Sequence, residues 1–390
     1  MFTSANPFTF CTPTKVLFGK DAIEGLPAEM AKCGHSVLLV YGGGSIKKTG
    51  LYDKVKTLLK DFSVYELSGV EPNPRVTSVN AGARLCREHK IDMVLAVGGG
   101  SVLDCCKVIC DAAFYEGDAW DLVLDSSKVT KALPLFTVLT LAATGSEFDN
   151  SAVISNLATN EKLPISHELN FPRCSVLDPT YTMSVSKKQT AAGCADIMSH
   201  IFEQYIVDGT NMVSEGLCDS VLRTVVKFGK IAWDNGSDYT ARANLMWASS
   251  LACNGICALG SDTGAWVCHG IEHELSAYYD ITHGEGLAIL TPVLMKYTLN
   301  DKTVERYASF AKNVFGIDKA DKFEAARAGI EALEQFFASI GLPKTLREVG
   351  INEKVHFKAM AEHACKTFPI SEAYVPLTPE QVVEILERCF

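Results

Sequence analysis

The chain has 390 residues, more than one hydrophobic core usually serves, so two domains are expected. Hydrophobic residues make up 47% and charged residues 21% of it, an ordinary globular composition that excludes extended disorder. The formal net charge of -10 argues against nucleic acid or an anionic membrane surface as the main partner, because both require a basic face. A small molecule is therefore the expected partner.

The N-terminus, the apolar runs and the cysteines together predict a cytoplasmic protein. Residues 1–10 have neither a basic n-region nor an uninterrupted apolar stretch, so no secretory signal is visible. The most apolar run, residues 132–143, is too short to span a bilayer and contains Pro134. The 14 cysteines are scattered and form no CxxC motif, which in a reducing compartment predicts buried thiols without a chemical role.

The first third of the sequence predicts strands that alternate with helices. Residues 8–18 read as short extended runs around Pro13 and predict an element at a sheet edge. The apolar run 36–41 then stops at a GGGS loop and gives way to a helical pattern over 46–61. A buried strand followed by glycines and a helix is typical of a βα unit.

The same pattern recurs downstream. A helical stretch over 76–90 leads to a strand over 91–97, a second GGGS loop, and a helix over 102–114. Further strands are predicted at 133–141 and 174–177. The alternation predicts an open, Rossmann-like parallel sheet whose loops bind a ligand at the carboxyl edge of the strands. Backbone N–H groups of the GGGS loops suit the phosphates of a nucleotide, although a plain tight turn explains about half of such glycine clusters.

From about Ser184 the apolar residues recur at helical spacing to the end of the chain, with almost no strand pattern between them. We therefore predict an α/β dinucleotide-binding domain at 1–182 and an all-helical, metal-binding and catalytic domain at 183–390. Thr378, Pro379 and Gln381 supply an N-cap, an N1 proline and a capping partner for the last helix.

Histidines and one aspartate in the predicted helical domain suggest a metal site. Asp196 and His200 are four residues apart on one helix face, and His269 and His273 repeat that spacing, with His283 in a Gly-flanked turn. One carboxylate with two or three neutral imidazoles suits zinc or ferrous iron. A single DxxxH pair is more often a plain hydrogen-bonded pair, with about one chance in ten of binding a metal by itself. The clustering of histidines in apolar or Gly-rich sequence raises those odds.

A family resemblance rests on several motifs in order, namely GGGSVLDCCK, ATGSE, DPT, TAAGCADIMSH and HGIEHELSAYYDITHGEG. With these motifs the chain resembles the iron-containing (group III) alcohol dehydrogenases over essentially its whole length, and within them the NADPH-dependent butanol dehydrogenase and aldehyde reductase branch. The resemblance implies a dehydroquinate synthase-like architecture, a nicotinamide cofactor and a divalent metal, Fe2+ before Zn2+. It also implies that small primary alcohols and aldehydes, such as butanol and butyraldehyde, are interconverted.

The same resemblance implies roles for individual residues. The metal ligands would be Asp196, His200, His269 and His283, and the catalytic positions His273 and Asp104. By this resemblance the cofactor-binding positions would be Gly99, Gly100, Ser101, Asp104, Thr140, Thr144 and Lys162. The first GGGS loop itself adds Gly42, Gly43, Gly44 and Ser45 as candidate cofactor-binding residues. One position departs from the family pattern, because Asp149 stands where relatives often carry Asn, which predicts an altered polarity beside the nicotinamide.

The loop after the first long strand predicts NADP(H) in preference to NAD(H). NAD-preferring proteins usually place a carboxylate near the end of an early strand, where it binds the ribose 2′-hydroxyl. Here the glycines are followed by Lys47 and Lys48, and no acid occurs before Asp53. Bare N–H groups, a hydroxyl and two ammonium groups suit a phosphate, unless the lysines are merely solvated.

Other interpretations remain open. A glycerol dehydrogenase-like polyol oxidoreductase or a dehydroquinate synthase-like lyase would share the scaffold, and a non-catalytic NADP-binding assembly module would share the cofactor loops. The extended residues 8–18 would leave an open sheet edge in a monomer, so pairing with a second copy predicts a homodimer.

Overall fold

The computed structural model describes residues 6–209, 211–262 and 264–390. Two compact units are present, an α/β unit of Cys11–Val185 with Ser237–Ser250, and a helical unit of the remaining described residues. The predicted ranges 1–182 and 183–390 differ from these units chiefly in residues 6–10, which belong to the helical unit, and in Ser237–Ser250, which belongs to the α/β unit.

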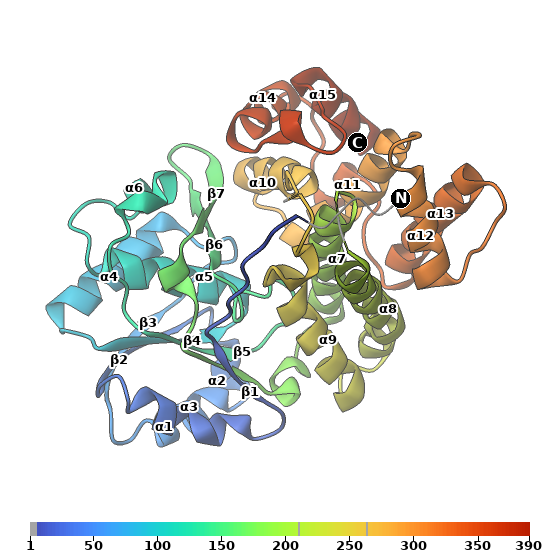
Figure 1. Cartoon of the computed structure of the whole chain (residues 1–390). Coiled ribbons are helices and arrows are strands. Elements are labelled where there is room, and N and C mark those ends of the chain that lie inside the picture. Colours follow the sequence, from blue (N-terminus) through green and yellow to red (C-terminus); the bar gives the residue numbers. More distant parts are fainter. Residues whose placement is uncertain (1–5, 210, 263) are drawn as a thin grey trace. The chain divides into compact units, whose positions relative to one another are not determined.

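A six-stranded parallel sheet forms the core of the α/β unit (Figure 1). Three of its strands are buried along their whole length, as expected for strands covered on both faces. The register pairs Tyr41 with Val97 and Gly98 with Leu139, so the loops that follow these strands emerge at one edge. In spatial order the strands are β1 (Lys15–Phe18), β8 (Cys174–Leu177), β5 (Leu135–Leu139), β4 (Met93–Gly98), β2 (Ser36–Tyr41) and β3 (Ser63–Ser68).

Helices cover both faces of this sheet, as Figure 1 shows. Alternate residues of β2 explain why: Leu38 and Val40 pack into one core with α4 and α5, whereas Val37 and Leu39 pack into another with α1 and α3. The helices of this unit are α1 (Leu26–Met30), α2 (Ser45–Lys48), α3 (Leu51–Leu58), α4 (Val76–Glu88), α5 (Gly100–Ala112) and α6 (Trp120–Leu124). The predicted parallel α/β fold is thereby confirmed.

Three features differ from the sequence prediction. The edge strand β3 carries polar residues at Ser63, Glu66 and Ser68, so no apolar run in the sequence indicated this strand. The antiparallel hairpin of β6 (Ser151–Asn156) and β7 (Glu161–Ser166) was also missed. The single helix predicted over 46–61 is two helices, because Gly50 adopts φ 77 between α2 and α3.

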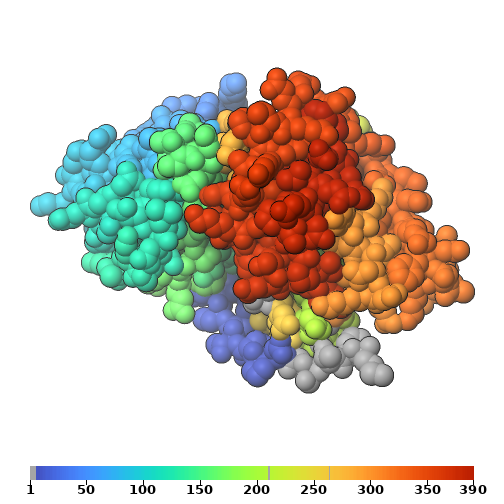
Figure 2. All heavy atoms as spheres, turned by 90° about the horizontal axis from the view of Figure 1, so that it is seen from above, coloured from blue at the N-terminus to red at the C-terminus, as the bar shows by residue number. Residues whose placement is uncertain are grey.

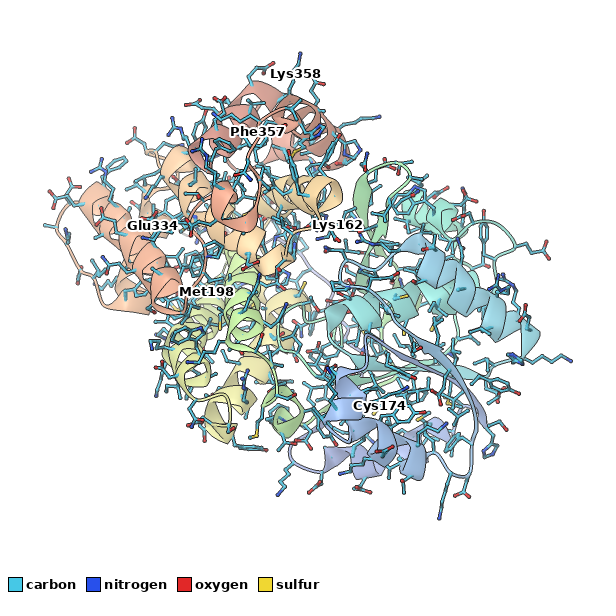
Figure 3. All side chains as sticks on the ribbon, turned by 180° about the vertical axis from the view of Figure 1, so that it is seen from behind. Lys162, Cys174, Met198, Glu334, Phe357 and Lys358 are labelled. Atoms are coloured by element: carbon cyan, nitrogen blue, oxygen red, sulfur yellow. The ribbon has the colours of Figure 1, made fainter. Side chains whose placement is uncertain are left out.

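The helical unit is built around α7 (Lys187–Tyr205), which is buried along most of its length. Figure 3 shows Met198 of α7 and Phe357 of α14 lying among helices, whereas Lys358 projects outward; Cys174 lies within the sheet of the other unit. The other helices are α8 (Met212–Asp234), α10 (Val267–Tyr279), α11 (His283–Thr298), α12 (Val304–Phe315), α13 (Lys322–Ser339), α14 (Phe357–Thr367) and α15 (Pro379–Arg388). The predicted capping box at Thr378 and Gln381 is confirmed.

Helix α9 (Tyr239–Cys253) contributes to both units. Its Met246 packs into the core of the α/β unit, which explains why residues 237–250 do not belong to the helical unit. In the helical unit α14 and α15 pack against each other, and Figure 2 shows them (red) next to the α12–α13 pair (orange). Among the described helices, none combines the length and apolarity needed to cross a bilayer.

Candidate functional site

Helix α7 presents the first two members of the candidate metal site. Asp196 and His200 are one helical turn apart on the same face, and both are about 95% buried or more. The Nε2 atom of His200 lies 3.5 Å from Oδ1 of Asp196. Ser186 caps the helix by accepting a hydrogen bond from the Gln189 N–H at 3.2 Å, which fixes where the helix begins.

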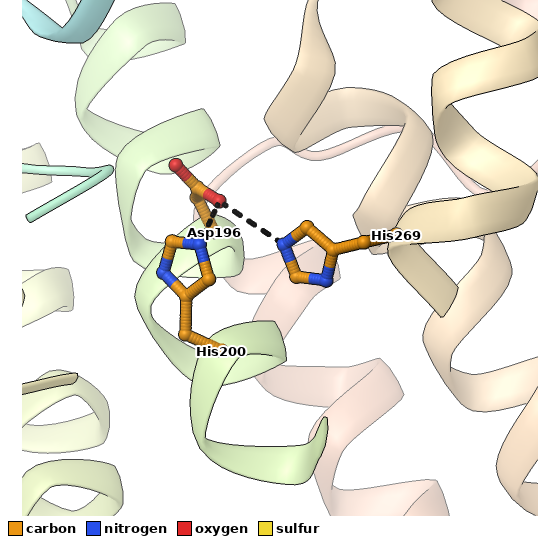
Figure 4. A group of neighbouring side chains, drawn as sticks. All are labelled: Asp196, His200 and His269. Atoms are coloured by element: carbon orange, nitrogen blue, oxygen red, sulfur yellow. Dashed lines mark ion pairs between the residues drawn. The ribbon is translucent and has the colours of Figure 1, made fainter. Parts of the chain in front are cut away.

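Two further imidazoles approach the same oxygen from neighbouring helices. His269 of α10 and His283 of α11 place their Nε2 atoms 3.8 and 3.7 Å from Oδ1 of Asp196. Figure 4 shows the Asp196 carboxylate facing the rings of His200 and His269. The expected turn at His283 is wrong, because this residue is the first of α11.

Gly284 makes the position of His283 possible. A Cβ atom at Gly284 would lie 2.1 Å from the carbonyl oxygen of Ala192, a backbone atom of α7 that cannot move aside. Only glycine therefore lets the start of α11 approach α7 closely enough for His283 to reach Asp196. The sequence shows a glycine directly after His283, but only the structure shows that close packing against α7 requires it.

Asp196, His200 and His269 form a group whose ligating atoms could hold a metal ion, and Nε2 of His283 lies 3.7 Å from the same Asp196 oxygen. Oδ1 of Asp196 and Nε2 of His269 are buried and have no hydrogen-bond partner within the described chain. A tetrahedral ion about 2.1 Å from each ligand atom sets those atoms roughly 3.4 Å apart. The observed nitrogen–oxygen distances of 3.5 to 3.8 Å are close to that spacing and too long for ordinary hydrogen bonds.

The electrostatics favour the ligating forms of Asp196 and His200. Burial opposes ionisation of Asp196, but the neighbouring imidazoles, His200 foremost, hold the pKa of its carboxyl well below the usual range. Burial lowers the pKa of His200 to about 3, which leaves this imidazole neutral. Burial acts in the same direction on His269, yet Asp196 and Glu203 outweigh it and raise its pKa to about 9.

Two glutamates orient the outer nitrogens of these histidines. Oε1 of Glu203 accepts the backbone N–H of His269 at 3.0 Å and lies 3.2 Å from its Nδ1. Glu272, which is fully buried, pairs through Oε2 with Nδ1 of His283 and through Oε1 with the Ser276 hydroxyl at 2.5 Å. Such carboxylate–histidine pairs fix the ring so that Nε2 faces a metal. The sequence analysis missed both residues, although each stands close to a predicted site histidine.

His273 lies beside this group, one turn along α10 from His269. Its side chain is buried, and its ring centroid is 5.6 Å from that of His283 and 5.5 Å from that of Phe368. Ligating atoms of His273, Glu272 and His283 lie within 4.8 Å of one another. His273 therefore borders the candidate metal site, and its role as a catalytic residue rather than a ligand stays a prediction.

In the α/β unit the first GGGS loop joins β2 to α2. A Cβ added to Gly43 or Gly44 would meet no atom within 4 Å, so these backbones border open space, and Ser45 is the first residue of α2. The ammonium of Lys47 lies 5.0 Å from the ring centre of Tyr41 and 4.8 Å from that of Tyr52.

An acid that the sequence analysis overlooked lies close by. Glu66 of β3 accepts hydrogen bonds from the hydroxyls of Tyr41 at 3.0 Å and Tyr52 at 2.9 Å. It also pairs with Lys56 at 2.9 Å. The carboxylate is therefore already hydrogen-bonded by two phenols and an ammonium, although it belongs to the strand next to β2.

The second GGGS loop packs against the loop that follows β5. The N–H of Thr140 donates to the Gly98 carbonyl at 2.9 Å, and a Cβ at Gly100 would lie 2.4 Å from Cγ2 of Thr144. The structure thus brings two sets of predicted cofactor residues together at the carboxyl edge of the sheet. These are Gly99, Gly100 and Ser101 at the start of α5, and Thr140 and Thr144 after β5.

Asp104 and Lys162, two other predicted residues, are buried near the hairpin. Asp104 accepts the N–H of Val153 on β6 at 3.0 Å, and burial raises the pKa of its carboxyl to about 6. Lys162 lies on β7, opposite Ser155 of β6. Asp104 therefore holds the hairpin against α5, and its catalytic role stays a prediction.

Asp149, the departure from the family pattern, has its charge paired inside the unit. The ammonium of Lys107, which has no exposed surface, lies 2.6 Å from Oδ1 of Asp149. The same oxygen accepts the Ser151 N–H at 2.8 Å. The neighbouring Glu147 bonds to the Ser250 hydroxyl at 2.5 Å, and burial raises the pKa of Glu147 to about 7.

Comparisons with known proteins cover nearly the whole chain. The family model for "Iron-containing alcohol dehydrogenase" matches residues 13–179, and that for "Fe-containing alcohol dehydrogenase family, C-terminal" matches residues 190–390. NADH-dependent butanol dehydrogenase A of Clostridium acetobutylicum is 53% identical, covering 98% of this chain and 99% of the relative. NADPH-dependent aldehyde reductase YqhD of Escherichia coli is 37% identical, covering 89% and 90%.

The structural comparison agrees. The crystal structure of NADH-dependent butanol dehydrogenase A from Thermotoga maritima superposes with a TM-score of 0.94 at 37% identity, covering 99% of both chains. The two family models, the relatives and the converging Asp196, His200, His269 and His283 lead to one conclusion: the chain belongs to the iron-containing alcohol dehydrogenase family and is an oxidoreductase.

Proposed function

We propose that this enzyme transfers hydride between NADP(H) and a small primary alcohol or aldehyde, of the size of butanol and butyraldehyde. The observation that carries the proposal is the convergence of the three imidazole Nε2 atoms of His200, His269 and His283 on one oxygen of Asp196. The names of the butanol dehydrogenase and aldehyde reductase relatives support the substrate class.

Asp196, His200, His269 and His283 would hold one divalent ion, with Fe2+ proposed ahead of Zn2+ because of the family. When bound, such an ion supplies Lewis acidity toward an alcohol or aldehyde oxygen, while a nicotinamide carries the hydride. Glu203 and Glu272 keep the rings of His269 and His283 turned so that Nε2 faces the Asp196 oxygen.

His273 is the proposed group for proton transfer. Its imidazole is buried one turn from His269, and Phe368 packs against its ring and restricts its orientation. A ring nitrogen of His273 accepts the alcohol proton during oxidation and returns it during reduction.

The proposed preference for NADP(H) rests on the loop after β2. The Gly43 and Gly44 backbones, the Ser45 hydroxyl and the Lys47 ammonium form a surface suited to a phosphate, and Glu66 is already hydrogen-bonded. NAD(H) is the second candidate, because two C. acetobutylicum relatives that are 53% identical are named NADH-dependent. A kcat/KM for NADPH at least tenfold above that for NADH would support the first candidate.

Two further proposals concern assembly and location. β1 lies at one edge of the described sheet, so pairing with a second copy would cover its open hydrogen-bonding groups and give a homodimer. Sedimentation at micromolar concentration tests this, and a monomer there contradicts it. We also retain the cytoplasm as the proposed location.

Elemental analysis of anaerobically purified protein, followed by an aldehyde panel with both nicotinamides, tests the proposed function. We expect about one equivalent of iron or zinc and oxidation of NADPH with butyraldehyde. Metal-bound protein that leaves every aldehyde and alcohol unchanged would contradict the substrate class. Activity on glycerol-like polyols alone would favour the polyol oxidoreductase instead.

A further inference from the structure

A cavity lies inside the helical unit next to the candidate metal site. Its volume is about 230 Å³, and it is partly open to solvent. Ser199 and Phe202 of α7 line it, together with Ile206, the C-cap residue of that helix. At helical spacing Phe202 lies on a different face of α7 from Asp196 and His200. Glu203 and Cys268 also line the cavity, so its inner wall lies beside His269.

The walls of the cavity combine apolar surface with an excess of negative charge. Phe202, Leu294, Met295, Tyr307 and Leu377 provide apolar and aromatic surface. Four carboxylates, Glu203, Asp208, Asp262 and Glu372, face one ammonium, that of Lys302. The Lys302 ammonium donates a hydrogen bond to the Tyr374 carbonyl at 2.7 Å and lies 4.2 Å from the centre of the Tyr374 ring.

These acids have little compensation from the protein itself. Within the described residues, Asp208, Asp262 and Glu372 form no ion pair with a lysine or arginine. Asp262 accepts only a neutral donor, the Asn6 amide at 2.6 Å, and Asp208 accepts the Gly209 N–H at 2.9 Å. These three carboxylates are exposed, so they contribute negative charge rather than buried charge. Negative charge beside apolar and aromatic walls favours a cationic ligand with an apolar body.

Glu203 connects this cavity to the metal site. Its side chain is about nine-tenths buried, and its Oε1 takes both contacts with His269. Its Oε2 has no hydrogen bond from any described residue, although Glu203 lines the cavity. Ser199, also buried there, has only the Cys268 thiol near its hydroxyl. The Ser199 hydroxyl is thus a buried polar group at the inner wall without a hydrogen-bond partner among the described residues, whereas Oε2 of Glu203 keeps some exposure.

We propose that this cavity binds a small organic cation of the alkylammonium or arylalkylammonium class, and that its occupancy alters metal retention through Glu203. The apolar body lies among Phe202, Met295 and Tyr307, and the charge lies beside the carboxylates. A cation near Oε2 of Glu203 draws carboxylate charge away from Nδ1 of His269. The ring is then held less firmly, and metal leaves the site faster.

Calorimetric titration of metal-free protein tests the binding. The probe is benzyltrimethylammonium, a quaternary cation that cannot coordinate a metal, and N-benzylacetamide serves as the neutral comparison. We expect the cation to bind at least tenfold more tightly, and the double variant Asp208→Asn, Glu372→Gln to reduce its affinity at least tenfold. The control Glu334→Gln removes an acid from the exposed pair with Lys296 and should change nothing. Equal binding of both probes, or no binding, overturns the proposal.

A second variant addresses folding and location. Ala373→Trp fills the cavity from its edge without removing a charge, so it should abolish cation binding while the far-ultraviolet circular dichroism stays unchanged. Cation binding that persists in this variant places the ligand elsewhere and overturns the assignment.

Metal release tests the connection through Glu203. With metal-loaded protein, a chromogenic chelator should capture the ion at least threefold faster when the cation saturates its site. In the Glu203→Gln variant, the increase in release rate caused by the cation should be less than half of the increase in the unaltered protein. Cation binding that leaves the release rate unchanged in the unaltered protein overturns the connection.

Discussion

The two units gather their candidate site residues by opposite means. In the helical unit, side chains from α7, α10 and α11 converge on one oxygen of Asp196, and two outer glutamates fix the rings of His269 and His283. In the α/β unit, the candidate cofactor surface is mostly backbone, presented by glycines at the ends of β2 and β4. A metal requires side-chain ligands at set distances, whereas phosphates bind to N–H groups. We therefore expect the removal of one side chain to abolish metal binding in the helical unit. In the α/β unit, we expect the addition of a side chain to a glycine to change cofactor binding.

The largest effect is expected from His200→Ala, which removes one ligand. Bound metal and turnover should fall to background, because one of the four proposed ligand atoms is lost and alanine leaves a gap in a buried site. Cofactor binding, followed by the fluorescence of NADPH, should persist, since the candidate phosphate loops belong to the α/β unit. A variant with full activity would contradict the metal assignment.

His273→Ala should separate catalysis from metal binding. We expect the metal content to stay near that of the unaltered protein while kcat falls by about 10²–10⁴-fold, the usual contribution of a general acid–base group. The change in KM should be smaller than the change in kcat. If the metal were lost from this variant, His273 would be a ligand, and the role of His283 would have to be revised.

Glu272→Gln tests whether the outer carboxylates matter to the metal. Replacement of such partners typically costs 10–100-fold in metal affinity, so chelator competition should show a loss of at least about tenfold. Gln preserves the size of a side chain that has no exposed surface, which limits damage to packing. Unchanged metal affinity would show that α10 and α11 alone hold the ring of His283.

Gly43→Asp should act on the other unit without touching the metal. The added side chain meets no atom within 4 Å at its Cβ, so it fits, and its charge repels a 2′-phosphate. The ratio of kcat/KM for NADPH to that for NADH should fall by about tenfold or more. Gly43→Asn is the matched control, equal in size and uncharged. The loop does not select the cofactor if both variants behave alike.

The smallest effect on activity, but a measurable one on stability, is expected from Asp111→Asn. Burial raises the pKa of Asp111 from its ordinary 3.8 to about 8. The folded protein therefore holds this proton more tightly than the unfolded chain, and the associated stability, complete below about pH 4, is lost as the pH rises to about 8. The Asn side chain does not ionise, so the variant does not lose this stability as the pH rises. The difference in Tm between the variant and the unaltered protein should therefore shift in favour of the variant from pH 5 to pH 8, by the equivalent of about 1 to 3 kcal/mol. Parallel Tm profiles would show that Asp111 is already ionised at pH 5.

Local patterns in the sequence were sufficient for many elements. Mostly apolar runs defined β2 and β8 to the residue, because strands covered on both faces need mainly apolar side chains. The four-residue spacing of Asp196 and His200 placed both on one face of α7, and Thr378 with Gln381 marked the start of α15. Each of these features depends on neighbours within about one helical turn or one strand.

Only the tertiary structure decided the features that depend on distant partners. Edge strand β3 is polar along much of its length, so Glu66 gained its place beside Tyr41 only through pairing with β2. Glu203 and Glu272 meet His269 and His283 because α7, α10 and α11 pack together, which Gly284 permits. Local periodicity determines which way a side chain points from its own element, but only the packing of elements far apart in sequence determines what that side chain meets.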